Sequence, residues 1–192
     1  MLLSNSLISW FSGPFQWILT IKPKGPAVAV TGQEADLTYT LDDLATEQQD
    51  LLLEHFDYDF AWALGLRMRD MAARDGVPVG ITVSHGTAPV FSVLMPGATP
   101  DNLDWMRRKT AVVHRFHRSS LALRLRAEAG GYDFNARFGL PVADYVASGG
   151  GVPLILRGGT LIGTAAVSGL PDVEDHRMVV SALRDLLGTQ RS

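Results

Sequence analysis

The sequence predicts an α/β fold of the α+β type, with one antiparallel sheet of four to five strands covered by helices. Two hairpin patterns carry this prediction, one over residues 77–94 and one over residues 151–168. Apolar positions at helical spacing precede, separate and follow them. The elements therefore follow the order α-β-β-α-β-β-α, and four strands pair into one sheet.

Residues 1–35 differ from the rest of the chain. Apolar residues are frequent there but Ser, Asn, Gly and Pro interrupt them, and no Lys or Arg precedes Lys22. The run is too broken for a membrane span of about 20 residues, and it lacks the basic start of a secretory signal. We expect a poorly ordered extension, or a stretch upstream of the true start. Residues 36–190 are expected to form a single domain.

Two helices are predicted before the first hairpin. Thr40 with Asp43 three residues later is a capping-box pattern, and helical spacing continues to about His55. Asp57 or Asp59 caps the second helix, which ends at Gly76.

The first hairpin pairs residues 77–83 with residues 89–94 around a turn at residues 84–87. Thr99 and Pro100 then open a helix that continues to His117, since a hydroxyl N-cap followed by proline favours a helix start.

Similar helix and turn signals predict the elements that follow residue 119. Helices are predicted over residues 120–129 and 141–148, followed by strands 152–157 and 160–167 around Gly158-Gly159. The last helix begins near Asp172, covers residues 173–187 and is closed by Gly188.

Composition limits the function classes. The chain has 192 residues, no cysteine and a net charge of −3. Without cysteine, disulfides, thiolate metal sites and a cysteine nucleophile are excluded, and a reducing cytoplasm is the expected location. The negative charge argues against nucleic acid as a partner. Basic residues nevertheless cluster at Arg107, Arg108, Lys109, Arg115, Arg118, Arg124 and Arg126.

Glycines and this basic segment are the candidate ligand contacts. Consecutive glycines let a backbone approach an anion closely, although by spacing alone two tight turns around a strand are the preferred explanation. Arginines on a helix grip carboxylates or phosphates, or form a solvated face or a subunit contact. The candidate ligand-binding residues are Arg107, Arg108, Arg115, His117, Gly149, Gly150, Gly151, Ser168 and His176.

A metal site is not predicted. Asp172 and His176 share a helix face at i, i+4 spacing and could hold a metal. The carboxylates at this helix start are better explained by stabilisation of the helix N-terminus.

Three blocks of sequence carry a resemblance to a known family: residues 99–120 with Asp-Asn, Trp and Arg-Arg-Lys in order, residues 149–153, and residues 162–176. The chain resembles the GlcG/HbpS-like proteins, also called haem-degrading-domain proteins, which are similar to the C-terminal domain of PduO-type adenosyltransferases. It is most similar to an uncharacterised branch of that superfamily. The likeness covers roughly residues 37–188. It implies an antiparallel-sheet domain, a symmetric homo-oligomer, and haem binding in some relatives.

We therefore expect a soluble homo-oligomeric protein that binds haem or another small anionic ligand near the second hairpin. Two alternatives stay open. One is a haem-degrading or haem-dependent enzyme with His85, His114, His117 or His176 as axial ligand. The other is a non-catalytic assembly or adaptor protein.

Overall fold

The computed structural model describes residues 39–190 of the chain, with side chains to Gly188. The expected extension over residues 1–35 lies outside the described residues. The helices are α1 (Leu41–Asp50), α2 (Tyr58–Asp75), α3 (Pro100–Phe116), α4 (Ser120–Ala129), α5 (Phe134–Phe138) and α6 (Asp172–Gln190). The strands are β1 (Gly80–His85), β2 (Ala88–Leu94), β3 (Gly151–Ile155) and β4 (Leu161–Ser168).

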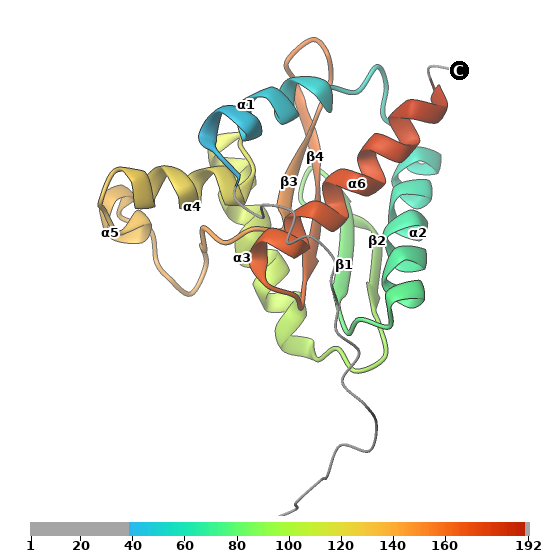
Figure 1. The fold of residues 1–192 in the computed structure, drawn as a ribbon, viewed down its shortest axis with the longest axis horizontal. Helices are drawn as coiled ribbons and strands as arrows, with labels where there is room; N and C mark the ends of the chain where they lie inside the picture. Colours follow the sequence, from blue (N-terminus) through green and yellow to red (C-terminus); the bar gives the residue numbers. More distant parts are fainter. Residues whose placement is uncertain (1–38, 191–192) are drawn as a thin grey trace, which may run out of the picture. The chain divides into compact units, whose positions relative to one another are not determined.

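The four strands form one antiparallel sheet in the order β2-β1-β4-β3, which confirms the predicted α+β fold (Figure 1). In each predicted hairpin the two strands pair with each other. The pairing of β1 with β4 joins the two hairpins. In that central pair Val83 lies opposite Ala165. The predicted end of β2 at Leu94 is confirmed, and the other predicted strand ends differ from the observed ones by one to three residues.

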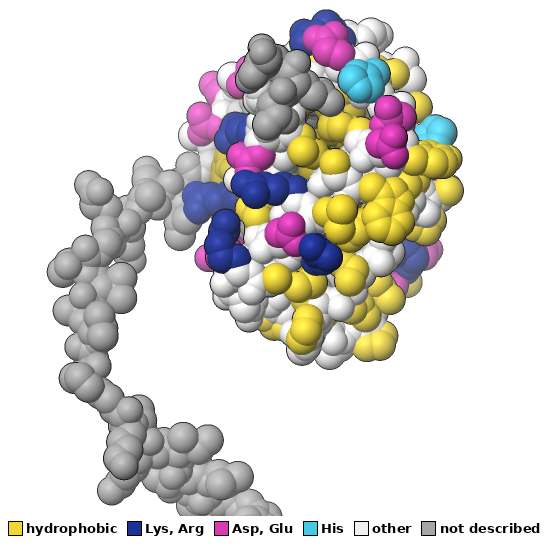
Figure 2. All heavy atoms as spheres, turned by 90° about the vertical axis from the view of Figure 1, so that its right-hand side faces the viewer, with side chains coloured by type: hydrophobic (Ala, Val, Ile, Leu, Met, Phe, Trp, Pro, Cys, Tyr) yellow, Lys and Arg dark blue, Asp and Glu magenta, His cyan; other side chains and the backbone are white. Residues whose placement is uncertain are grey.

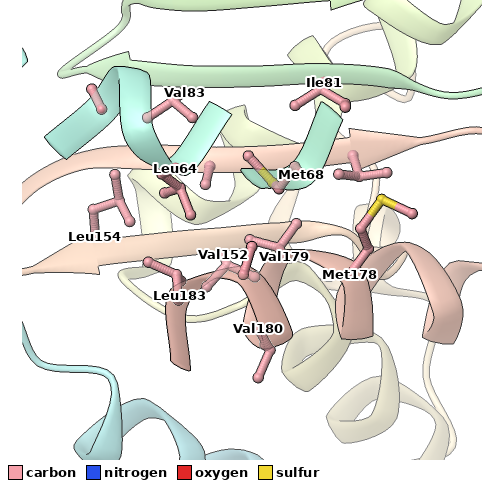
Figure 3. Close-up of a cluster of buried hydrophobic side chains, with 14 of the residues drawn as sticks. Leu64, Met68, Ile81, Val83, Val152, Leu154, Met178, Val179, Val180 and Leu183 are labelled. Atoms are coloured by element: carbon pink, nitrogen blue, oxygen red, sulfur yellow. The ribbon is translucent and has the colours of Figure 1, made fainter. Parts of the chain in front are cut away.

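Helices cover both faces of the sheet. Apolar side chains of β1, β3 and β4 meet those of α2 and α6 on one face, as the close-up of Leu64, Ile81, Leu154 and Leu183 shows (Figure 3). The opposite face meets α3, because Gly80 lies against Met106 and alternate residues of a strand share a face. The sheet is thus buried on both sides.

Most helix termini match their sequence signals. Thr40 and Asp43 form a capping box at α1, and the Asp57 side chain accepts from the Phe60 backbone N–H at α2. Gly76 closes α2 in the left-handed conformation with φ 65°. His117 ends α3 with φ 52°, an uncommon conformation for a residue with a side chain.

The first helix ends earlier than predicted. α1 stops at Asp50, and the expected continuation to His55 is wrong. Leu53 instead leaves the helix and joins the edge of β3, where its N–H donates to the Ile155 carbonyl and its own carbonyl accepts from Arg157. Its side chain is buried in the core. Burial against the sheet therefore overrides the helical spacing.

The helix predicted over residues 141–148 is also wrong, since these residues form a turn and an irregular segment. The segment's backbone is bonded elsewhere: Arg107 donates to the Ala143 carbonyl, and Asn135 donates to the Tyr145 carbonyl. A short helix, α5, lies just upstream and was not predicted. Gly188 does not close the last helix either, because α6 continues to Gln190.

Within the described residues, none of the helices combines the length and apolar character that crossing a bilayer requires.

Candidate functional site

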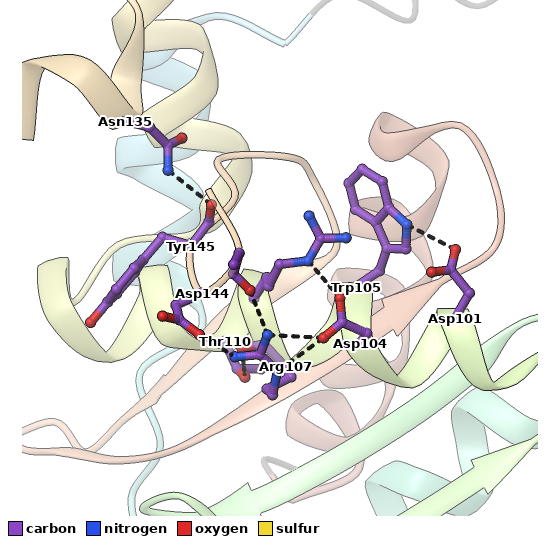
Figure 4. Close-up of polar contacts among 10 residues, drawn as sticks. Asp101, Asp104, Trp105, Arg107, Thr110, Asn135, Asp144 and Tyr145 are labelled. Atoms are coloured by element: carbon purple, nitrogen blue, oxygen red, sulfur yellow. Dashed lines mark hydrogen bonds and ion pairs between the residues drawn. The ribbon is translucent and has the colours of Figure 1, made fainter. Parts of the chain in front are cut away.

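The predicted arginine Arg107 is tied to its own part of the fold. Its guanidinium pairs with Asp104 at 2.9 Å and Asp144 at 3.2 Å, and donates to the Ala143 carbonyl at 2.6 Å (Figure 4). Arg107 therefore fastens the segment after α5 to α3. Surface ion pairs such as these contribute about 1 kcal/mol or less each, so their role is to position the segment.

Arg108 is held on the same helix. Its Nε lies 2.8 Å from Asp104, and its guanidinium stacks on the Trp105 ring at 4.3 Å from the centroid. The side chain is half-buried. Arg115 makes no ion pair among the residues that the structure describes and rests against Phe116, 5.9 Å from its centroid.

The glycine run 149–151 is packed inside the domain. A Cβ on Gly149 would lie 2.1 Å from the Asp172 carbonyl oxygen, and one on Gly150 would lie 2.4 Å from that of Val167. The Gly149 N–H donates to Asp172, and the Gly151 N–H to the Ser120 hydroxyl. These glycines let the start of β3 approach α3, α4 and α6. Their close contacts are with the protein itself.

A buried ion pair lies beside the glycine run. Lys109 Nζ is 2.8 Å from Asp175 Oδ2 and also donates to the Val167 carbonyl, and both side chains are 2% exposed. Burial raises the pKa of Asp175, and the nearby Lys109 opposes that rise. Lys109 is a member of the basic cluster predicted from the sequence, yet its side chain lies in the interior. The missed signal is its spacing from Met106 and Val113, which face the sheet.

Ser168 and His176 are also interior residues. The Ser168 carbonyl accepts from the Asn102 amide at 3.1 Å, which joins α3 to the end of β4. His176 Nε2 lies 2.7 Å from Glu47 Oε1, and the pair joins α6 to α1. Asp172, the partner considered for a metal, instead pairs with Arg124. No cluster of three or more potential metal ligands occurs among the described residues.

A surface groove lies where α1, α4 and the end of α3 meet, and we call it the α1–α4 groove. It comprises three adjoining hollows of about 270, 360 and 530 Å³ that share lining residues. The hollows of 360 and 530 Å³ lie in the range of small-molecule sites, about 300–1,000 Å³, and the hollow of 270 Å³ lies just below it. The apolar lining includes Leu41, Leu44, Leu52, Phe116, Leu123, Tyr132 and Phe138.

The groove is positively charged. Its arginines are Arg118, Arg126, Arg137 and Arg157, and no Asp or Glu lines these three hollows. A fourth hollow, which shares Leu41 and Ala129 with them, is lined by Asp42 and Glu128. Arg157 pairs with Glu54, whereas the other three have no ion-pair partner in the described part of the chain. His117 is also in the lining, and of the nine predicted ligand residues it alone reaches one of these hollows. Arg118 and Arg126 belong to the basic cluster predicted from the sequence, whereas Arg137 and Arg157 do not.

The groove's histidine has a partly buried neighbour, His114. Burial lowers the pKa of His114, the charge of His117 lowers it further, and a contact with the Gly86 backbone opposes both. The unfolded chain therefore binds a proton more readily than the folded one. Stability should fall as the pH drops below about 6.5.

Thermal unfolding at pH 7.5 and pH 5.5 tests this effect. His114→Gln should show a smaller loss of Tm between the two pH values than wild type does. His55→Gln, at an exposed position between α1 and α2, is the control and should retain the wild-type loss. An unchanged loss in His114→Gln would contradict the assignment.

Comparison with known sequences identifies similar proteins. The model of the family described as "Haem degrading protein HbpS-like" matches residues 56–184. A UPF0303 protein of Burkholderia thailandensis is 44% identical over 153 residues, covering 80% of this chain and 93% of that protein. A UPF0303 protein of Paraburkholderia phymatum is 42% identical with the same coverage.

Solved structures share the fold. The Ybr137w protein superimposes with a TM-score of 0.74 at 26% identity, over 80% of this chain and 90% of that one. A complex of PduOC with haem gives a TM-score of 0.58 at 20% identity, over 67% and 93%. HbpS gives a TM-score of 0.54 at 20% identity, over 70% and 91%. The last two likenesses concern the fold alone.

Proposed function

Since the chain belongs to the HbpS-like family and is related to the UPF0303 proteins, we propose that it binds haem, or another flat apolar ligand with acidic groups, in the α1–α4 groove. The lining of this groove supports the proposal most directly, since it combines apolar side chains with four arginines, and the nearest lining carboxylates, Asp42 and Glu128, belong to the adjoining hollow. The haem complex of the structurally similar PduOC protein supports the ligand class.

The residues present fit haem. Its porphyrin is a flat apolar surface, and Leu41, Phe116 and Leu123 offer apolar contacts. Arginine binds carboxylates with two parallel hydrogen bonds, so Arg118 and Arg126 would hold the propionates. Bound haem would supply an iron centre for ligand binding and redox chemistry.

His117 is the histidine best placed to ligate the iron. No described residue bonds to its exposed imidazole, and it lines the groove. The other candidates are engaged: His176 is buried against Glu47, His85 Nδ1 lies 3.3 Å from the Tyr58 hydroxyl, and His114 contacts the Gly86 backbone.

The proposal has two further parts. The protein self-associates as a symmetric homo-oligomer, which is the assembly that the family resemblance implies. It works in the cytoplasm, as its lack of cysteine favours.

Hemin titration followed at the Soret band tests the ligand site. Wild type should shift the band at micromolar hemin, and Arg118→Glu/Arg126→Glu should weaken binding at least about 100-fold, since each charge-assisted contact contributes about 1.5–3 kcal/mol. Arg74→Glu, an exposed arginine on α2, is the matched control and should bind as wild type does. No Soret shift at tens of micromolar hemin would refute haem binding.

Two further measurements separate the role of the arginines from that of His117, and haem binding from haem degradation. Metal-free protoporphyrin carries the same acidic groups, so it should bind with similar dependence on the arginines but without dependence on His117. His117→Ala should change the Soret position of bound hemin. Loss of the band with oxygen and a reductant would indicate haem degradation, whereas a persistent band would indicate binding alone.

A further inference from the structure

The outer surface of α2 carries an apolar stripe. Tyr58, Trp62 and Leu66 lie one helical turn apart and are 58%, 52% and 37% exposed. The space-filling view of the face that carries α2 shows hydrophobic side chains gathered between charged ones (Figure 2). Trp62 is braced by Phe91 of β2, whose ring centroid lies 5.4 Å away. Rigid exposed aromatics of this kind are enriched at protein interfaces.

The neighbouring strand leaves an edge of the sheet open. β2 is the first strand in the order and pairs only with β1 among the described strands. Its sequence, Ala-Pro-Val-Phe-Ser-Val-Leu, contains no charged residue. Proteins protect such an edge with charges, proline, bulges or a covering segment. β2 has Pro89 and a bulge near its start, but it has no charge, proline or bulge from Phe91 to Leu94. An uncharged edge beside an exposed aromatic stripe is typical of a surface that another chain covers.

The charges on α2 indicate that the chain covering this surface is a second copy of the same protein. Asp59 and Arg69 lie five residues before and after Leu64, and both are exposed. Arg69 also pairs with its neighbour Asp70, so within one chain it already lies against a carboxylate. Trp62 and Leu66 are likewise equally far from Leu64, two residues before and two residues after it. When a helix packs antiparallel to its own copy across a two-fold axis at Leu64, each residue faces its mirror position. Asp59 then faces Arg69 of the other copy, and Trp62 faces Leu66.

We propose that the α2–β2 face, formed by Tyr58, Trp62, Leu66 and the edge of β2, is a two-fold interface between two copies of this chain. A two-fold axis perpendicular to the sheet places α2 antiparallel to α2 and β2 alongside β2 at once, because α2 packs over β1 and β2. The inference rests on the self-association in the proposed function and assigns its surface. It does not depend on haem.

Sedimentation equilibrium at 1–100 µM tests the interface. Wild type should have at least twice the chain mass of 20.8 kDa. Trp62→Glu should raise the dissociation constant at least about 30-fold, the effect of losing a central interface residue. Leu103→Glu, on an exposed apolar residue of α3, is the matched control and should assemble as wild type.

A charge exchange keeps the test independent of Trp62 and its packing. Asp59→Arg and Arg69→Asp should each weaken self-association by placing like charges opposite one another. The double variant Asp59→Arg/Arg69→Asp should restore it, and a mixture of the two single variants should form a mixed dimer. A wild-type monomer over this range would overturn both the self-association and the interface. A wild-type oligomer that Trp62→Glu and the charge variants leave intact would overturn the interface alone.

Discussion

Replacing Gly150 with alanine should destabilise the protein by at least about 3 kcal/mol, with loss of soluble protein in the extreme case. Gly150 has a φ of 111°, which residues with a Cβ rarely adopt. The new Cβ would lie 2.4 Å from the Val167 carbonyl oxygen and 2.9 Å from Lys109 Nζ. The backbone of β4 or the ion pair must move to admit it. Urea unfolding followed by circular dichroism measures the change.

Gly158→Ala is the matched control, because it lies in the turn of the same hairpin and an added Cβ meets nothing within 4 Å. Its free energy of unfolding should stay within about 0.5 kcal/mol of wild type. Equal stability of the Gly150 and Gly158 variants would show that the glycine run is not constrained by packing. The run would then be available for the ligand contact that its sequence first indicated.

Replacing Lys109 with methionine should destabilise the protein by about 3–5 kcal/mol, since it leaves the buried carboxylate of Asp175 without its partner. Arg67→Met, which breaks an exposed pair with Asp185, should cost less than about 1 kcal/mol. The double variant Lys109→Met/Asp175→Asn should recover at least half of the loss, because asparagine is neutral and still accepts from the Leu170 N–H.

The destabilisation caused by Lys109→Met should depend on pH through the carboxyl group of Asp175. Burial raises the pKa of Asp175, so the folded protein holds this proton more tightly than the unfolded chain does. Stability contributed by the group therefore falls as the pH rises above the unfolded value, near 3.9. Without Lys109 the rise in pKa should be larger, and Lys109→Met should be closer to wild type at pH 5 than at pH 8. A loss independent of pH would contradict this account.

The fold was largely predictable because its local signals agree with its packing. Capping residues marked the starts of the helices, and β-branched runs around turns marked both hairpins. Errors arose where distant contacts decide the backbone. Leu53 leaves α1 to bond β3, and residues 143–145 bond Arg107 and Asn135. No short stretch of sequence contains these partners.

The candidate site was less predictable. Basic charge alone did not separate Arg107, which is paired with nearby acids, from Arg118 and Arg126, which make no ion pair among the described residues. The glycine run 149–151 likewise predicted a close approach of the backbone, but the sequence did not show whether the partner is a ligand or the protein itself. The interior position of Lys109 depends on the face that α3 turns to the sheet, which becomes known only once the sheet is assembled.

The pairing of β1 with β4 has a consequence for how the chain folds. The first hairpin is complete once Leu94 has been synthesised, but its inner edge is covered only when Val83 meets Ala165, roughly 70 residues after Leu94. During translation at about 5–20 residues per second, that edge stays open for several seconds. We therefore expect slow, late completion of the sheet, and nascent chains cut before β4 should depend on chaperones for their solubility.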